Sequence, residues 1–205
     1  MTSLDFKQTI SAFDIERQML AQELAQSIAS KETIAAGLLL CLSFLVGRQV
    51  DGLQIVKLDR IYPLKRNQGL IDFKLVCRLP NQTQVDLGIC VLPSPDFEYV
   101  TEACTRLLSY KDFGLDRLCL LRPGDLMTDV YQLPTCLPKL LSSDIGGHFI
   151  PLKTRDLLTI LTTLSVFRHK DQYLITSEMI TAYLTQQDIL TSNILIKNIL
   201  ATAQF

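Results

Sequence analysis

The sequence has almost no net charge and few histidines, and it lacks the short motifs of the common enzyme classes. The formal net charge is −1, so the chain as a whole is not drawn to nucleic acid or to a membrane, and any polyanion site must be a local basic patch. Neither His148 nor His169 has a nucleophile and an acid at a recognisable spacing, so no catalytic triad is predicted. The glycines at 146 and 147 belong to no GxGxxG or GxxxxGK[ST] phosphate loop.

Targeting and membrane-spanning segments are also not expected. The N-terminal residues MTSLDFKQT do not combine a basic leader with an apolar stretch, so no signal peptide is predicted. Residues 34–47 are almost entirely apolar, but they cover only 14 positions, whereas a helix needs about 20 to cross a bilayer. This stretch is therefore interpreted as a core helix. The expected location is the cytoplasm, with no membrane partner.

The cysteines are spaced unlike a metal site or a disulfide framework. None of the six forms a CxxC pair, and no histidine stands at metal-ligand spacing to any of them. Most fall within apolar runs, where a thiol behaves as a small hydrophobic group. We expect reduced, buried cysteines, as in proteins of reducing compartments.

The apolar pattern predicts an α/β (α+β) fold with a central mixed sheet. Helical spacing covers residues 4–29, and Ser30 is a plausible cap for the apolar helix that follows. Three runs with strand character, at 53–62, 70–79 and 85–92, are separated by turn-forming segments. A helix is predicted to start at Ser94 and Pro95 and to end near Gly114, ahead of a short strand at 118–121. The expected order is helix, three strands, helix, strand, with the last strand pairing in parallel.

Domain boundaries are predicted from the distribution of proline and glycine. Residues 1–125 are expected to form the α/β core with its N-terminal helices. Residues 126–153 are rich in helix and strand breakers, which predicts an irregular connector. Residues 154–205 are expected to form a small three-helix element, with helices near 154–169, 176–187 and 191–203.

The element order over residues 31–122 resembles that of the PD-(D/E)XK nucleases, the restriction-endonuclease-like superfamily. In that family, one acid on the second core strand and a second acid on the third strand hold Mg²⁺. A lysine two positions after the second acid helps to activate water. The literal motif in this sequence is Asp72-Phe73-Lys74 with Asp59 upstream, one strand earlier than the family places it.

The placement that matches the family's topology makes Asp72 the first acid and Asp86 the second. The lysine position is then Gly88, which cannot activate water. The resemblance therefore favours a non-catalytic module with a nuclease-like fold, which needs no cofactor. The alternative is an active Mg²⁺-dependent endonuclease, with Asp72 and Asp86 as metal ligands and catalytic acids and with Lys74 or a relocated lysine as the third catalytic group.

Two segments are candidates for nucleic-acid contact. One is a basic cluster around the first predicted turn, whose members are Lys57, Arg60, Lys65 and Arg66. The other is the last predicted helix, which carries Asn193 and Lys197 and would be the recognition helix of a helix-turn-helix element. In each case the competing interpretation is structural, as a solvated strand face or as a small helical bundle.

The function expected from these patterns is that of a subunit or adaptor in a DNA-processing or defence assembly. It would act through contacts with a protein partner or a second copy of the chain, and it has DNA as a candidate ligand. A helix-turn-helix DNA-binding regulator is a further alternative. No small-molecule cofactor is expected.

Overall fold

The structure is a computed structural model that describes residues 3–62, 67–123 and 135–204. The chain divides into two compact units, each made of segments that are distant in the sequence. The helical unit contains Met1–Leu45 and Thr154–Ile196, and the sheet unit contains Val46–Lys153 and Lys197–Phe205.

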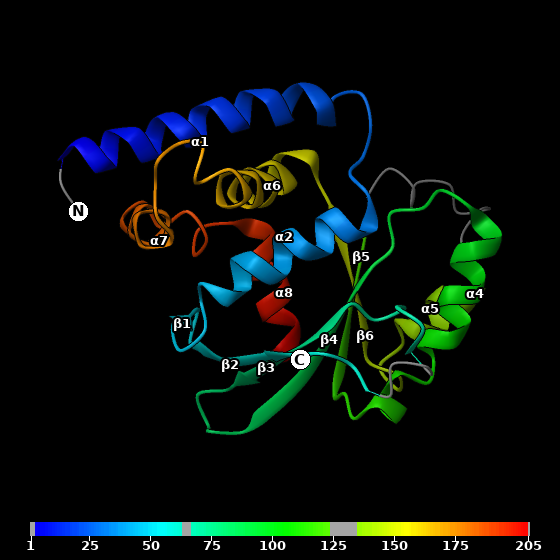
Figure 1. Cartoon of the computed structure of the whole chain (residues 1–205). Coiled ribbons are helices and arrows are strands. Elements are labelled where there is room, and N and C mark those ends of the chain that lie inside the picture. The colour runs from blue at the N-terminus through cyan, green and yellow to red at the C-terminus, as the bar shows by residue number, and fades with distance from the viewer. Residues whose placement is uncertain (1–2, 63–66, 124–134, 205) are drawn as a thin grey trace. The chain divides into compact units, whose positions relative to one another are not determined.

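The helical unit is built from helices contributed by both ends of the chain. Their bounds are α1 (Ser3–Leu24), α2 (Lys31–Ser43), α6 (Thr154–Arg168) and α7 (Ser177–Gln186). Helix α1 packs against α6 and α7, and α2 packs against α6 (Figure 1). Ser30 caps α2 as predicted, because its hydroxyl accepts a hydrogen bond from the Thr33 N–H. Gly37 allows α2 to lie close to α6, since a Cβ there would be 2.9 Å from Cγ2 of Ile160.

The sheet unit contains one six-stranded mixed sheet in which spatial order follows chain order. The strands are β1 (Gln49–Val50), β2 (Leu53–Asp59), β3 (Phe73–Arg78), β4 (Gln84–Val91), β5 (Arg117–Pro123) and β6 (Gly147–Leu152). Strands β1 to β4 pair antiparallel, whereas β4, β5 and β6 pair in parallel. Helix α4 (Phe97–Leu107) connects β4 to β5. The predicted α/β class, the mixed sheet and the parallel crossover are confirmed.

A buried apolar cluster fills one face of the sheet beneath α4 and α5 (Cys136–Leu140) (Figure 1). Cys90 of β4 and Leu120 of β5 meet Leu107 of α4 and Leu140 of α5 in this cluster. The other face of β4 and β5 contacts η4 (Thr202–Gln204), the short turn after α8 (Ile194–Ala201). Both faces of β4 are therefore covered, which explains why its sequence is almost entirely apolar.

The predicted domain boundaries need correction. The interval 126–153 is not wholly irregular, because it contains α5 and β6; residues 126–134 of it lie outside the described part of the chain. Proline and glycine are compatible with this structure. Strand β6 is an edge strand, where Pro151 is tolerated. Gly147 lets α5 approach, since a Cβ there would be 2.7 Å from the Leu140 carbonyl oxygen. The N-terminal helices belong with α6 and α7, not with the sheet.

The start of helix α4 differs from the predicted start. Helix α4 is capped by Asp96, whose carboxylate accepts the Tyr99 N–H, and the Ser94 hydroxyl instead accepts the Asp96 N–H. The helix therefore starts two residues later than predicted.

All six cysteines are free, and five of them are buried. Burial raises the pKa of the Cys41 thiol to about 12. Within the described residues, no helix is both long and apolar enough to cross a membrane.

Candidate functional site

The acid and lysine side chains of the proposed nuclease-like site meet as an ion pair. Lys74 on β3 and Asp86 on β4 lie on one face of the sheet, with Lys74 Nζ 2.7 Å from Asp86 Oδ2. Both side chains are about four-fifths buried, at 21% and 19% exposure. The ammonium therefore neutralises the carboxylate that would be the second metal ligand.

Two residues of β2 extend this pair into a group of alternating charge. Lys57 Nζ is 2.6 Å from Asp59 Oδ2, and Asp59 pairs in register with Lys74. The hydrogen bond and charge of Asp59, with a contribution from Asp86, raise the pKa of Lys57. We call Lys57, Asp59, Lys74 and Asp86 the sheet charge cluster. Because it holds equal numbers of positive and negative groups, it does not favour a phosphate.

Asp72 has a different role, at the start of β3. Its backbone N–H donates to the Ile89 carbonyl at 2.8 Å, and its carboxylate accepts the Val91 N–H at 2.7 Å. The side chain thus provides an acceptor to β4 just beyond the end of the β3–β4 ladder. A buried backbone N–H needs such an acceptor. This is a structural use of the carboxylate that was predicted as the first catalytic acid.

The register of β3 and β4 separates Asp72 from Asp86. Asp86 pairs with Val76, which is four residues along β3 from Asp72. At about 3.3 Å per residue, the two acids are about 13 Å apart along the strand. Two carboxylates that share one Mg²⁺ both lie within about 2.1 Å of it, so this arrangement does not fit the metal. Among the described residues, no group of three or more His, Cys, Asp or Glu side chains is placed to hold a metal ion.

The lysine position of the topological placement is filled by the apolar core. A Cβ built on Gly88 would lie 2.6 Å from Leu115 Cδ1 and 3.3 Å from Leu118 Cδ1. Both leucines are buried. Glycine is required here because the loop before β5 packs directly on the β4 backbone.

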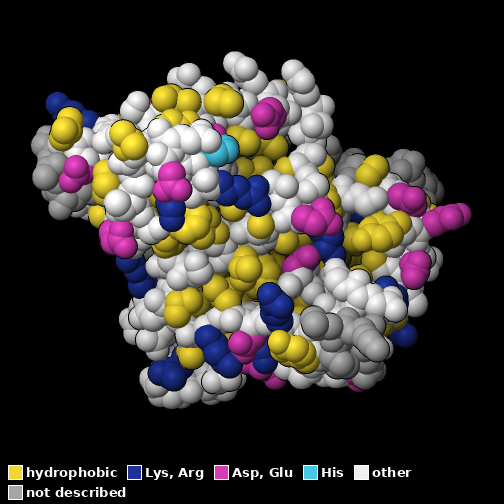
Figure 2. Space-filling view, viewed as in Figure 1, with side chains coloured by type: hydrophobic (Ala, Val, Ile, Leu, Met, Phe, Trp, Pro, Cys, Tyr) yellow, Lys and Arg dark blue, Asp and Glu magenta, His cyan; other side chains and the backbone are white. Residues whose placement is uncertain are grey.

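The predicted basic cluster is only partly described, because Lys65 and Arg66 lie outside the described residues. Lys57 is paired with Asp59, and Arg60 is exposed at the end of β2. On the face shown in Figure 2, the described basic and acidic side chains are interspersed. The described residues of this region therefore do not form a continuous basic surface of the kind that binds a nucleic-acid backbone.

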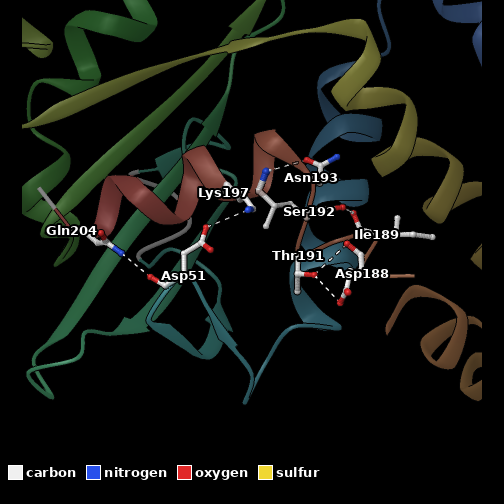
Figure 3. A network of polar contacts seen from close by, with 9 residues as sticks. Asp51, Asp188, Ile189, Thr191, Ser192, Asn193, Lys197 and Gln204 are labelled. Carbon is white, nitrogen blue, oxygen red and sulfur yellow. Dashed lines mark hydrogen bonds and ion pairs between the residues drawn. The ribbon is translucent and has the colours of Figure 1, made fainter. Parts of the chain in front are cut away.

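Of the two polar residues proposed to read bases, Asn193 caps α8 and Lys197, within the helix, lies near Asp51. Asn193 is buried, and its side-chain oxygen accepts the Ile196 N–H at 3.1 Å (Figure 3). Its amide nitrogen donates to the Asp156 carbonyl at 3.3 Å. It acts as a helix cap. Lys197 Nζ lies 3.9 Å from Asp51 Oδ2, and the amide of Gln204 donates to the Asp51 carbonyl (Figure 3).

A polar centre in the helical unit was missed by the sequence predictions. Glu16 of α1 is 4% exposed and accepts hydrogen bonds from Ser165 Oγ at 2.6 Å and Tyr173 Oη at 2.8 Å. His169 Nδ1 is 2.9 Å from the same carboxylate. We call Glu16, Ser165, His169 and Tyr173 the Glu16 hub. The signal in the sequence was the spacing of four between the three partners, which places them on one side of α6 and its extension.

The Glu16 hub has the residue types of a hydrolase triad but not its geometry. The Ser165 hydroxyl donates to the glutamate, and Nδ1 is the histidine nitrogen that faces both Glu16 and Ser165. A triad needs the serine on the ring nitrogen opposite the acid. Burial by itself raises the pKa of Glu16, but the hydrogen bonds from Ser165, Tyr173 and His169, together with the charge of His169, outweigh it and lower the pKa.

The comparisons with known proteins add no family assignment to this geometry. No protein-family model matches the chain. No curated protein matches it either. The PD-(D/E)XK nucleases therefore remain a resemblance in the order of the elements.

Proposed function

We propose that this protein is a non-catalytic module with a nuclease-like sheet, which serves as a subunit or adaptor in a DNA-processing or defence assembly. The single observation that carries the proposal is the Lys74–Asp86 ion pair beside Gly88. An active site of the family needs two acids on one metal ion and a lysine near the attacking water. In this chain the lysine neutralises one of the acids.

The order of the elements supports the nuclease-like part of the proposal. A helix, the antiparallel strands β2, β3 and β4, the helix α4 and the parallel strand β5 follow one another as in that superfamily. The additional strand β6 extends the sheet beyond β5. Fold alone does not establish function, so the chemistry of β3 and β4 decides between a catalytic and a non-catalytic module.

A contact surface for a protein partner is available on α1. Its exposed apolar side chains include Leu4, Ile15 and Met19, at 73%, 44% and 54% exposure. Their spacings of eleven and four residues place them on one side of the helix. A protein partner or a second copy of the chain would cover this surface, in agreement with an adaptor role.

The alternatives draw less support from the described residues. An active nuclease would need Asp72 and Asp86 to converge, and the strand register holds them apart. A helix-turn-helix regulator would present Asn193 to DNA, yet its amide is engaged as a helix cap. DNA binding that falls steeply with salt and is lost in Lys197→Ala would favour the regulator instead.

A cleavage assay tests the proposal. Purified wild-type protein and the Asp86→Ala variant are incubated with plasmid and linear DNA in Mg²⁺ and in Mn²⁺. We expect no cleavage above background from either protein, because Asp86 is engaged by Lys74 and the lysine position is Gly88. Metal-dependent cleavage by the wild type that is absent in Asp86→Ala would show that the module is an enzyme.

A further inference from the structure

A cavity of about 440 Å³ opens in the helical unit between α1, α6, α7 and the segment that leads into α8. All of its lining residues belong to that unit. Its size is within the range of pockets that bind small organic molecules, about 300–1,000 Å³. None of its residues takes part in the sheet charge cluster, so the cavity is independent of the proposed function.

Charged groups of both signs line the cavity in equal number. Arg17 and Arg155 provide two guanidinium groups, and Asp14 and Asp156 provide two carboxylates. Within the described part of the chain, the guanidinium of Arg17 makes no hydrogen bond or ion pair. The side chain of Asp156 is 10% exposed. Its carboxylate lies 3.6 Å from Arg155 Nε, which is too long for a hydrogen bond. Both charge signs therefore keep capacity for a ligand.

Thr162, a residue of the cavity wall, carries a buried hydroxyl with no hydrogen-bond partner. Oγ1 of Thr162 is the one buried side-chain oxygen or nitrogen, among the described residues, that makes no hydrogen bond. Thr162 is only 3% exposed and lines the cavity. Its neighbour Thr163 follows the usual helical pattern, donating to the Thr159 carbonyl at 3.0 Å. Unpaired buried polar groups are rare, and this one requires an explanation.

Two aromatic rings give the cavity an apolar side. The rings of Phe13 and Tyr183 are 4.6 Å apart between centroids, and both residues line the cavity. Burial, and then the charge of Asp14, raise the pKa of the Tyr183 phenol, while Arg17 opposes the shift. The phenol therefore stays protonated and able to donate a hydrogen bond at neutral pH.

We propose that this cavity binds a small zwitterion of the amino-acid class. Its carboxylate would lie against Arg17 and Arg155, and its ammonium would lie against Asp156. The apolar part would pack on Phe13 and Tyr183, and a rotation of the buried Thr162 side chain would present its hydroxyl to the polar group that enters deepest. A simple anion fits less well, because it would leave both aspartates unneutralised beside the ligand.

The test is a binding experiment with the full chain and a panel of the standard amino acids. Isothermal titration calorimetry is expected to find at least one that binds with a Kd below about 1 mM. Two analogues of that amino acid serve as controls. The first is its amide, which lacks the carboxylate, and the second is the corresponding carboxylic acid without the amino group, which lacks the ammonium. Both analogues are expected to bind at least about tenfold more weakly, as the loss of one ionic contact predicts.

Four variants separate an effect on binding from an effect on folding. Arg17→Gln is expected to weaken binding about tenfold, whereas Arg168→Gln, at an exposed arginine at the end of α6, leaves it unchanged. Thr162→Val removes the unpaired hydroxyl, so it is expected to keep or raise the Tm of the free protein while weakening binding several-fold. Thr163→Val is the contrast, because it removes the hydrogen bond to the Thr159 carbonyl and is expected to lower the Tm.

Three outcomes would overturn the proposal. The first is that no amino acid binds at concentrations up to about 10 mM. The second is that binding is unaffected by both Arg17→Gln and Thr162→Val, which would place the site elsewhere. The third is that the acid without the amine binds as tightly as the amino acid, which would make the cavity a simple anion site.

Discussion

Replacing Glu16 by alanine is expected to lower the free energy of unfolding by about 3 kcal/mol. The carboxylate is buried and joins α1 to the three partners Ser165, His169 and Tyr173. Hydrogen bonds to a charged group contribute about 1.5–3 kcal/mol each, but bonds that share one acceptor are not additive. The variant also leaves the partly buried donors without their shared acceptor. Urea denaturation followed by circular dichroism measures the difference.

Glu23→Ala is the matched control for Glu16→Ala, and the stability contributed by Glu16 is expected to depend on pH. Glu23 is exposed on the same helix, so Glu23→Ala is expected to change the stability by less than about 0.5 kcal/mol. The pKa of Glu16 is lowered in the folded state, so its contribution is fully present at neutral pH. That contribution falls as the pH drops below about 4, through the folded pKa. Equal stabilities of Glu16→Ala and Glu23→Ala at pH 7 would show that the Glu16 hub stabilises nothing.

Introducing lysine at Gly88, the position at which the resemblance to the nucleases would place a lysine, is expected to destabilise the sheet unit and to produce no nuclease activity. The first side-chain carbon would already lie 2.6 Å from Leu115 Cδ1, inside a buried cluster. Overpacking of this kind costs about 1–3 kcal/mol for a single methyl group. A buried ammonium adds more, so we expect a loss above about 3 kcal/mol for Gly88→Lys. Thermal and urea unfolding measure the loss for Gly88→Lys and, for comparison, for Gly88→Ala.

A double substitution tests whether a steric conflict with Leu115 causes the destabilisation by side chains at position 88. Shortening Leu115 to alanine removes the atom that Gly88→Ala would meet, so the double variant should be less destabilised than the sum of the single variants. A coupling of about 1 kcal/mol is expected for residues in direct contact. Additive losses, or a Gly88→Lys protein as stable as the wild type, would mean that the core does not fill the lysine position.

Local patterns in the sequence were enough to predict most of the elements. The strands β2, β3 and β4 follow from runs of branched and aromatic residues between turn-forming segments, and α6 and α7 follow from helical spacing. The parallel pairing of β4 with β5 follows from the helix between them. These features depend on neighbours along the chain, which a sequence displays directly.

The features that were missed depend on partners far away in the sequence. Strand β6 carries Pro151 and begins at the second of two consecutive glycines, and its place at the sheet edge makes those residues acceptable. The Glu16 hub joins residues about 150 positions apart, and a glutamate in an amphipathic helix is usually exposed. The pairing of α1 with α6 is likewise a property of tertiary packing.

The sequence names the candidate residues of β3 and β4, but it does not reveal which of their side chains meet. Alternation along β3 places Asp72 and Lys74 on one side, and the same rule applies to Asp86 and Gly88 on β4. Which of these residues meet is decided by the register of the two strands, which pairs Val76 with Asp86 and Lys74 with Gly88. That register brings Lys74 to Asp86 and leaves Asp72 to accept the Val91 N–H.

The central claim, that Asp72 and Asp86 are structural residues and not ligands of one metal ion, is tested most directly by metal binding, which requires no knowledge of a nucleic-acid substrate. Electron paramagnetic resonance of Mn²⁺ titrated with the protein counts the bound ions. We predict no stoichiometric binding at metal concentrations up to about 1 mM. Binding of one or two ions per chain that disappears in both Asp72→Asn and Asp86→Asn would contradict the claim.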